Sequence, residues 1–325
     1  MRVLVTGGRG LLGSAVVRGL LARGDDVTVL QRTPAGHGSA VREILGDVTD
    51  PEAVRSAMAG AQGVVHLAAR VSMVGEWRDF ERTNVGGTRL VVEAARAAGA
   101  DRFVHVSSPS VAHAGDPLVG APAGPADPEH ARGHYARSKA MAELVALATQ
   151  QPGFPVVAIR PHLVWGPGDT QLVGRIAERA RQGRLVLIDD GAALIDTTYV
   201  DNAADAIVAS LARCHRDDVR GRAFVVSNGE PRTVAEILAL IAGAAGAPAP
   251  TRRVPYPIAR AAGAVIERAW QRAGRADEPP MTAFVAEQLA TAHWFDQRQT
   301  RAALDWRPRV GLDEGFARLA ASMAP

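Results

Sequence analysis

A tyrosine and a lysine four residues apart are the side chains of this sequence best placed for proton transfer. They are Tyr135 and Lys139, within GHYARSKAMAE at residues 133–143. Four residues make about one helical turn, so both side chains would project from the same face. An ammonium beside a phenol stabilises the phenolate and lowers the tyrosine pKa from about 10. The pair could then exchange a proton with a carbonyl or alcohol oxygen, although most such pairs lie on ordinary helix surfaces.

Two serines supply a third polar group. Ser107 and Ser108 end an apolar run at residues 102–108, and parallel sheets bind ligands at the carboxyl ends of their strands. A hydroxyl there could hydrogen-bond the reacting oxygen. Because a lone serine at a strand end is usually a cap, this interpretation depends on a cofactor site elsewhere in the chain.

Glycines at a three-residue spacing indicate that cofactor site. Gly7, Gly10 and Gly13 follow the apolar run Arg2–Thr6 and precede a segment of helical period. Such glycines allow a tight turn, close approach of a pyrophosphate, and close packing of helix on strand. The helix N-terminus then faces the phosphates. With the strand before it and the helix after it, the pattern is a strong signal for a dinucleotide.

The second strand predicts which dinucleotide is bound. It ends in Gln31 and Arg32, so no carboxylate is available for a ribose 2′-hydroxyl, whereas a guanidinium suits a 2′-phosphate. Arg9, inside the glycine turn, could add to this site. We therefore favour NADP(H) over NAD(H); the alternative is that both arginines are solvated surface residues. Asp47 and Val48, after the third strand, are placed to flank the adenine.

Short apolar strands alternate with helices of about three turns, which predicts an α/β fold with a doubly wound, Rossmann-type parallel sheet. We expect a nucleotide-binding domain at 1–165 and a smaller, mostly helical substrate domain at 166–325, with strands near 193–202 returning to the first. Residues 113–133 are predicted to form a long loop, and 83–99 a helix. A further helix at 258–272 should pack its apolar face on the core, in preference to a membrane; that face holds Ile258, Ala262, Val265, Ile266, Ala269 and Trp270.

Composition excludes several classes of protein. The 325 residues are 47% hydrophobic, enough for a sizeable core, and the net charge of +3 is too small for a nucleic-acid protein. The single cysteine, Cys214, excludes an intrachain disulfide and a multi-cysteine zinc site, and we expect no metal. No signal peptide pattern and no apolar run of about 18 residues is visible. We therefore expect a cytoplasmic protein without a membrane span.

A series of motifs in a specific order resembles the extended short-chain dehydrogenases/reductases over nearly the whole chain: TGGRGLLG, GDVTD, HLAA, TNVGGT, HVSSPSV, YARSK, RPHLVWGPGD, TTYVDNAADA and LDWRPRVGLDEG. The resemblance implies Ser108, Tyr135 and Lys139 as the catalytic set, with Ser107 and Ser110 as weaker candidates. It implies a homodimer formed through the TNVGGT and YARSK helices. It also implies a set of cofactor contacts beyond the glycines and arginines: Leu11, Leu67, Ala68, Ala69, Asn84, Tyr135, Lys139, Pro161 and Leu163.

Two features of the sequence predict the substrate: one position that differs from the sugar-nucleotide enzymes of the family, and several segments that resemble another branch. Family members that bind sugar nucleotides carry an arginine for the diphosphate where this chain has Ile195, although Arg175, Arg179 or Arg184 could substitute. The segments SSPSV, RPHLVWGPGD, SNGEP and EPPMTAFVAEQLATAHWFD resemble the 3β-hydroxysteroid dehydrogenase/sterol C4-decarboxylase branch, and within it the 2-alkyl-3-oxoalkanoate reductases.

The resemblance predicts an NADP(H)-dependent oxidoreductase that interconverts a ketone and a secondary alcohol on a hydrophobic 2-alkyl-3-keto acid or steroid-like compound. Two alternatives remain: an NAD-dependent nucleotide-sugar epimerase or dehydratase, and a non-catalytic NADP-binding regulator, which would tend to lose the Tyr–Lys pair. Several side chains could line an apolar pocket or simply belong to the core: Val71, Met73, Val74, Trp77 and Trp165. His134 and His162 could contact a carboxylate or the nicotinamide.

Overall fold

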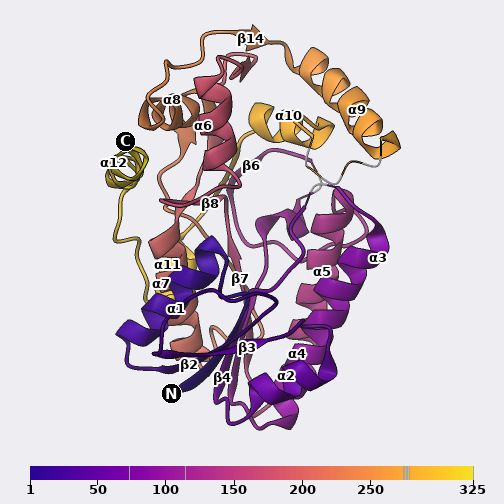
Figure 1. The fold of residues 1–325 in the computed structure, drawn as a ribbon, viewed down its shortest axis with the longest axis vertical. Coiled ribbons are helices and arrows are strands. Elements are labelled where there is room, and N and C mark those ends of the chain that lie inside the picture. The colour runs from indigo at the N-terminus through magenta and orange to yellow at the C-terminus, as the bar shows by residue number, and fades with distance from the viewer. Residues whose placement is uncertain (73, 114, 274, 276, 278, 325) are drawn as a thin grey trace.

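A parallel β-sheet forms the centre of the molecule (Figure 1). The computed structural model describes residues 1–325 apart from 73, 114, 274, 276, 278 and 325. Within this part, seven strands lie in the order β3–β2–β1–β4–β5–β7–β12 and all neighbours are parallel. Their bounds are β1 Arg2–Thr6, β2 Asp26–Gln31, β3 Val41–Leu45, β4 Gly63–His66, β5 Arg102–Val106, β7 Val156–Pro161 and β12 Ala223–Val226. The predicted doubly wound sheet is confirmed, with its switch point between β1 and β4.

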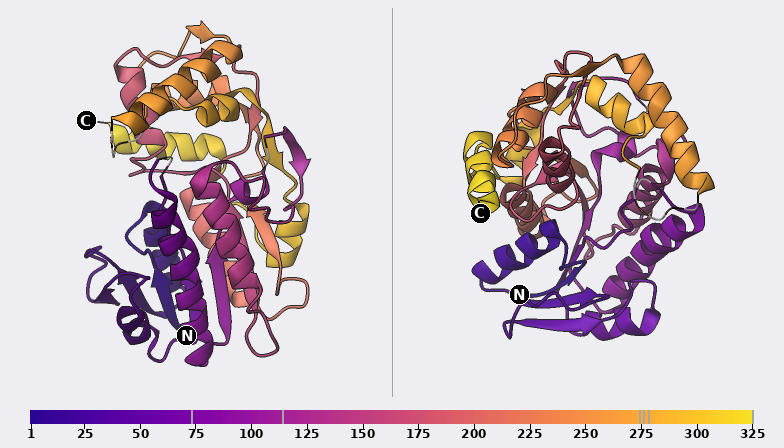
Figure 2. Two further views of the ribbon diagram at one scale, coloured as in Figure 1. Left: turned by 90° about the vertical axis from the view of Figure 1, so that its right-hand side faces the viewer. Right: turned by 45° about the horizontal axis from the view of Figure 1, so that its top comes forward.

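Helices cover both faces of this sheet, as Figures 1 and 2 show. One face carries α1 Leu11–Ala22, α7 Val200–Arg213 and α11 Arg298–Leu304, and the other carries α2 Pro51–Met58, α4 Gly87–Ala97 and α5 Gly133–Leu147. The strands are therefore buried on both sides, which explains their continuous apolar runs. In β1, for example, Val3, Leu4 and Val5 are all buried, and alternate residues belong to two separate core clusters.

The remaining elements build a second, mixed region above the carboxyl ends of the strands (Figure 2). Its helices are α6 Val173–Arg181, α8 Val234–Ala244, α9 Tyr256–Arg272, α10 Ala283–Ala290 and α12 Leu312–Met323. Its strands are β6 Leu118–Ala121, β8 Val164–Trp165, β9 Leu187–Ile188, β10 Leu194–Ile195, β11 Thr198–Tyr199, β13 Arg232–Thr233, β14 Arg253–Val254 and β15 His293–Phe295. The region is thus less helical than expected, since β13, β10, β15 and β6 form a four-stranded sheet within it.

Two expectations about connectivity are wrong. The predicted loop at 113–133 contains β6, which pairs with β15 about 170 residues further along the chain, a partner that no local pattern can reveal. The strands near 193–202 do not join the main sheet: β10 pairs with β13 and β15, and β11 pairs with β8. The segment that returns to the main sheet is α7 followed by β12. A division of the chain at residue 165 stays a prediction.

The helix predicted at 83–99 begins earlier than expected, at Trp77, and its first part is not regular α-helix. A short helix, α3 at Trp77–Phe80, runs into a π-helical segment at Glu81–Gly86 and then into α4. The residues of this π-helical segment include Asn84, whose side chain is buried. Segments of π-helix occur often at functional sites, and this one lies directly against α5.

Helix α9 does not bury the face that its sequence predicted. Ile258 is 60% and Val265 is 64% exposed, whereas Ala259 and Gly263 are buried against α10. A β-carbon on Gly263 would lie 2.5 Å from the carbonyl carbon of Thr282, so the two backbones approach closely. Small residues therefore define the buried face, and a hydrophobic pattern does not detect them. None of the described helices combines the length and apolar character needed to cross a membrane.

Candidate active site

The glycine turn lies at the switch point of the sheet and has the shape of a phosphate cradle. Gly7 has φ of 77° and a β-carbon there would lie 2.9 Å from the Ala68 nitrogen. A β-carbon on Gly13 would overlap the Gly7 carbonyl oxygen, whereas the nearest atom to one on Gly10 is 3.7 Å away. The turn therefore packs tightly on the protein side and stays open at the N-terminus of α1, which begins at Leu11. This geometry fits the pyrophosphate of a dinucleotide.

The segment after β2 folds back beside this turn. Arg9 donates from Nη1 to Thr33 Oγ1 at 2.9 Å, and Arg32 is exposed beside it. The imidazole of His37 contacts the Gly8 carbonyl oxygen at 3.1 Å. The Glu43 carboxylate accepts the backbone N–H groups of residues 35 and 37, each at 3.2 Å, and these bonds hold its pKa below the ordinary value. Arg9 and Arg32 therefore both belong to this side of the glycine turn, and their contact with a 2′-phosphate stays a prediction.

Side chains expected along the adenine and ribose differ in how open they are. Asp47 accepts from the nitrogen and hydroxyl of Thr49 at 2.9 and 2.8 Å, and Val48 is buried against Gly87. After β4, the chain is partly exposed at Leu67, Ala68 and Ala69. The Ala68 N–H anchors this segment by donating to Thr6 Oγ1 at 3.1 Å. These positions flank the carboxyl edge of the sheet.

Asn84 occupies a different place from the other predicted cofactor residues. It is 1% exposed, and its Oδ1 accepts the Arg70 N–H at 2.7 Å. Its Nδ2 donates to the Arg70 carbonyl oxygen at 3.2 Å and to Ser138 Oγ at 2.8 Å. Both ends of the amide are already used, so Asn84 braces the strand-β4 loop against α5. A direct contact with the cofactor stays a prediction that these bonds argue against.

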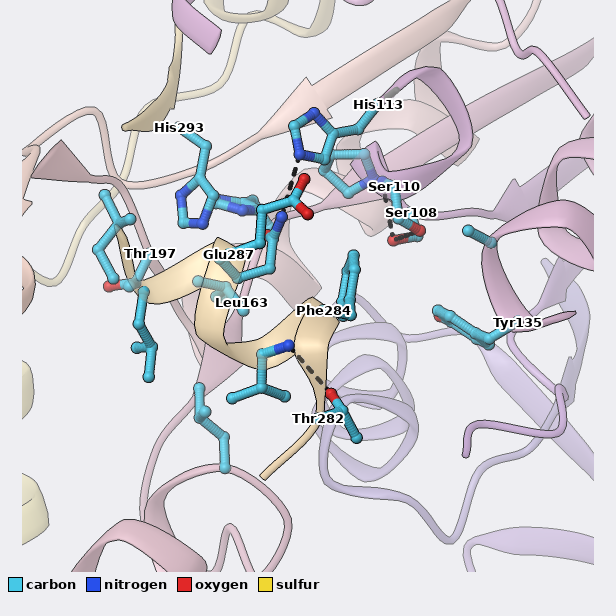
Figure 3. A pocket seen from close by; sticks show the side chains of 18 of the residues that line it. Ser108, Ser110, His113, Tyr135, Leu163, Thr197, Thr282, Phe284, Glu287 and His293 are labelled. Atoms are coloured by element: carbon cyan, nitrogen blue, oxygen red, sulfur yellow. Dashed lines mark hydrogen bonds between the residues drawn. The ribbon is translucent and has the colours of Figure 1, made fainter. Parts of the chain in front are cut away.

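The predicted catalytic side chains come together at the carboxyl end of β5. The Ser108 hydroxyl lies 2.9 Å from that of Ser110, and Ser108 and Tyr135 line the same end of one cavity (Figure 3). Lys139 is 3% exposed and donates from Nζ to the Val106 carbonyl oxygen at 2.6 Å. Ser107 points elsewhere, since its buried hydroxyl finds no hydrogen-bond partner in the described part of the chain. The structure therefore groups Ser108, Ser110 and Tyr135.

The direction of the tyrosine pKa differs from the expectation. Burial raises the pKa of Tyr135 above its ordinary value of 10, and the neighbouring Ser108 hydroxyl opposes this only in part. The expected lowering by Lys139 is wrong for this structure, because the ammonium turns to the Val106 carbonyl oxygen. Burial also lowers the pKa of Lys139 to about 8. The phenol thus holds its proton firmly until negative charge develops beside it.

A cavity of about 640 Å³ opens in front of the two hydroxyls, between the main sheet and the mixed region. Figure 3 shows Tyr135 and Ser108 at one end of it, His293 and Thr197 at the other, and Phe284 between them. Much of the lining is aliphatic and comes from α8, from α6 and from the residue that precedes α6: Leu172, Ile176, Val234, Ile237, Leu238 and Ile241. Such a site suits a substrate with extended apolar parts.

The cavity wall at the end of β7 includes Pro161 and Leu163. Their predicted contact with the nicotinamide stays a prediction. Leu163 has φ of 41°, a left-handed conformation that is rare for a branched side chain. Its carbonyl accepts the Thr198 N–H at 3.2 Å, which ties β11 to this turn. Backbone strain of this kind occurs preferentially at ligand sites, where the surrounding structure enforces it.

The other candidate pocket residues divide. Val71 and Trp165 line the cavity, Val74 and Trp77 do not, and Met73 lies outside the described residues. Ile195, His134 and His162 line it as well. The Nδ1 atom of His162 lies 2.5 Å from the Asp196 carbonyl oxygen. Burial lowers the pKa of this ring to about 3. His162 is therefore neutral, and its Nδ1–H donates to Asp196. Of the substitute arginines, Arg175 reaches the cavity.

Sequence reasoning missed a polar group in the cavity wall. Arg132 pairs with Glu287 of α10 at 2.6 Å, and His113 lies 3.0 Å from the Gln288 amide nitrogen. The second carboxylate oxygen of Glu287 is buried without a hydrogen-bond partner among the described atoms. These residues come from segments up to 175 positions apart, so spacing could not join them. The usable signal was the segment EPPMTAFVAEQLATAHWFD, which contains Glu287 and Gln288.

A dinucleotide turn, a parallel sheet with its switch point beside that turn, and a Ser–Tyr–Lys group at the next strand end define an NAD(P)-dependent oxidoreductase of the extended short-chain dehydrogenase/reductase type. The chain belongs to the NAD dependent epimerase/dehydratase family, whose model matches residues 3–227. The predicted fold and family are confirmed.

Individual proteins within and near this family are similar to the chain over nearly its whole length. A 2-alkyl-3-oxoalkanoate reductase of Stenotrophomonas maltophilia is 42% identical over the full length of both chains. The human decarboxylating sterol-4-alpha-carboxylate 3-dehydrogenase is 29% identical, over 98% of this chain and 87% of its own. Among solved structures, MoeE5 in complex with UDP-glucose and NAD is 26% identical with a TM-score of 0.73, covering 99% of this chain and 98% of its own.

Proposed function

We propose that the chain is an NADPH-dependent ketoreductase that interconverts a ketone and a secondary alcohol on a 2-alkyl-3-keto acid. The observation that carries this proposal is the pair of hydroxyls, Ser108 and Tyr135, at the end of a largely apolar cavity of about 640 Å³. The 42% identity to a 2-alkyl-3-oxoalkanoate reductase supports the acid as substrate. Arg9 and Arg32 beside the glycine turn support NADPH over NADH.

In the proposed mechanism the chain supplies binding, orientation and one proton. Bound NADPH would deliver a hydride to the carbonyl carbon. Ser108 donates a hydrogen bond to the carbonyl oxygen, and Ser110 holds the Ser108 hydroxyl in place. Tyr135 gives its phenolic proton to that oxygen as negative charge forms on it, leaving the alcohol and a phenolate. Lys139 stabilises the phenolate and binds the ribose, and the raised Tyr135 pKa prevents early loss of the proton.

Two other substrates have a specific observation in their favour. Relatives named as steroid or sterol dehydrogenases make a 3-ketosteroid the first competitor. Arg175 in the cavity wall and the UDP-glucose complex of a structural neighbour favour a sugar nucleotide, against which Ile195 lines the cavity where an arginine would be needed.

The substrate is tested with a panel of three compounds and two readouts. NADPH oxidation is followed with a 2-alkyl-3-keto acid and with a 3-ketosteroid, and UDP-glucose binding is measured by calorimetry. We expect the keto acid to give the highest kcat/KM and UDP-glucose to give no heat of binding. Turnover of the steroid alone would replace the substrate class, and tight UDP-glucose binding without ketone reduction would overturn the ketoreductase.

A further inference from the structure

A buried ion pair lies behind the catalytic residues of α5. Glu143 follows Lys139 by one helical turn, as Lys139 follows Tyr135, so the three lie along one face. Arg160 of β7 donates from Nε to Glu143 Oε2 at 2.9 Å and from Nη2 to Oε1 at 2.5 Å. Both side chains are 1% exposed. A two-bonded, fully buried pair of this kind fixes the position of the carboxylate.

Arg160 also connects this pair to the rest of the site. Its Nη1 donates to the Gly124 carbonyl oxygen at 2.7 Å, in the segment between β6 and α5 that borders the cavity. The next residue along the strand is Pro161, which lines the cavity. The guanidinium therefore donates its hydrogen bonds to the Glu143 carboxylate and to the Gly124 carbonyl oxygen, and none of these bonds involves Lys139.

The ammonium of Lys139 has few charged neighbours. His105 of β5 and His66 of β4 face it, and burial is the main cause that lowers the pKa of each, to about 3 for His66. Both rings are neutral at pH 7, since His66 bonds two threonine hydroxyls and neither ring nitrogen of His105 finds a partner within the described chain. With Tyr135 uncharged, the negative charge acting on Lys139 is that of Glu143.

We propose that Glu143 is a positioning residue for the reaction: its carboxylate, fixed by Arg160, keeps Lys139 in the ammonium form despite its burial. This inference rests on the roles proposed above for Tyr135 and Lys139. Burial pulls the pKa of Lys139 down to about 8, and Glu143 acts in the opposite direction. Without that carboxylate the lysine would lose its proton close to neutral pH, and the phenolate formed in each reduction would lose its counter-charge.

The composition of the chain allows a direct test. Lys139 is the single lysine among 325 residues, so protein grown with isotope-labelled lysine gives one side-chain signal in an NMR spectrum. Its chemical shift followed against pH yields the pKa of Lys139 without substrate or cofactor. We expect the Glu143→Gln variant to lower this pKa by about one unit, the effect of removing an opposite charge at helical-turn distance.

A second variant separates charge from folding. Glu143→Gln leaves the Arg160 guanidinium buried without its anion, which destabilises proteins strongly. The double variant Glu143→Leu with Arg160→Met replaces the pair by apolar groups, a change that is often neutral for stability. We expect it to unfold at nearly the wild-type temperature and to show a lowered Lys139 pKa, by less than in Glu143→Gln because the positive charge of Arg160 is removed as well. Glu93→Gln, an exposed carboxylate on α4, is the matched control and should leave the pKa unchanged.

The kinetic consequence has a definite sign. In each Glu143 variant the alkaline limb of kcat for ketone reduction should move to lower pH by as much as the Lys139 pKa falls in that variant. Lys139 titrating as in the wild type in both variants would overturn the inference and leave the pair a purely structural contact. A shifted Lys139 titration in a protein that reduces no ketone would instead contradict the proposed function alone.

Discussion

At the scale of single residues, the choice of lysine at position 139 carries information. The chain has one lysine, and arginine supplies every other strongly basic side chain. The compact ammonium fits the buried space beside Val106, where Nζ donates a hydrogen bond of 2.6 Å to the Val106 carbonyl oxygen. An ammonium there can approach both a phenolate and a ribose. A guanidinium is larger and planar and cannot replace it there. The position therefore selects lysine chemistry against the composition of the whole chain.

The first prediction concerns that choice. Lys139→Arg should lower kcat for ketone reduction by about a hundredfold or more, because the phenolate loses a correctly placed counter-charge. The matched control is Arg137→Lys on the exposed side of the same helix, whose guanidinium stacks over Trp77, and it should keep kcat within about twofold of the wild type. Steady-state kinetics of both variants decide the point. Equal kcat in Lys139→Arg and the wild type would show that the ammonium is not needed.

The second prediction concerns the cofactor. Arg32→Ala should weaken NADPH binding by about tenfold to a hundredfold, the value of a charge-assisted hydrogen bond, and leave NADH binding unchanged. Arg42→Ala, an exposed arginine of β3, is the control and should change neither. Tryptophan-fluorescence titrations with both dinucleotides measure the effect. Parallel loss of NADPH and NADH affinity would mean that Arg32 does not contact a 2′-phosphate.

Spacing along the chain predicted the residues of the site better than their charge states. Gly7, Ser108 and Tyr135 were found because each follows a recognisable strand or lies on a recognisable helix. The direction of the Tyr135 pKa was wrong, since it depends on burial that only the folded cavity determines. The Arg160–Glu143 pair was missed for a similar reason, because a strand and a helix meet there through tertiary packing.

At the scale of elements, α9 shows what a hydrophobic pattern cannot detect. Its contact with α10 is made through Gly263, where the approach of the Thr282 backbone leaves no room for a side chain. Strands β9, β13 and β14 were missed because two residues carry no period. The strands of the main sheet other than β12 were predicted, because burial on both faces favours apolar runs.

A pair of glycine substitutions tests the packing of α9. Gly263→Ala should destabilise the protein by about 1–3 kcal/mol and raise KM for the ketone, because the new methyl group displaces α10 from the cavity wall. Gly243→Ala in α8 is the matched control, since a β-carbon there meets no atom within 4 Å, and it should be neutral or stabilise by about 0.5–1 kcal/mol. Thermal unfolding and KM of both variants are compared. Equal stability of the two would contradict the close approach of α9 and α10.

At the scale of the whole molecule, buried histidines predict sensitivity to acid. Burial lowers the pKa of His66 and His162 to about 3 and that of His293 to about 4. Below about pH 6.5 the unfolded chain binds protons at these side chains and the folded chain does not. Each histidine therefore lowers the free energy of unfolding by about 1.4 kcal/mol for every pH unit that the pH falls. Burial raises the Asp196 pKa to about 6, which acts in the opposite direction over part of this range.

The histidines outnumber the aspartate, so the free energy of unfolding should fall steadily from pH 6.5 to pH 4. Urea unfolding at several pH values measures this slope. His293→Gln should make the slope shallower, whereas His215→Gln, at an exposed position, should leave it unchanged. A free energy of unfolding that is level between pH 6.5 and pH 5 would contradict the neutral, buried state of these rings. The homodimer implied by the family resemblance stays a prediction, and so does the cytoplasmic location expected from the sequence.

The measurement that tests the central claim most directly compares wild type with Tyr135→Phe. NADPH oxidation with a 2-alkyl-3-keto acid is followed in both proteins, and NADPH affinity is measured in parallel by tryptophan fluorescence. The account predicts turnover in the wild type, its loss by a factor of about a hundred or more in the variant, and similar NADPH affinity in both. Undiminished turnover in Tyr135→Phe would contradict Tyr135 as the proton donor, and with it the proposed chemistry of this site.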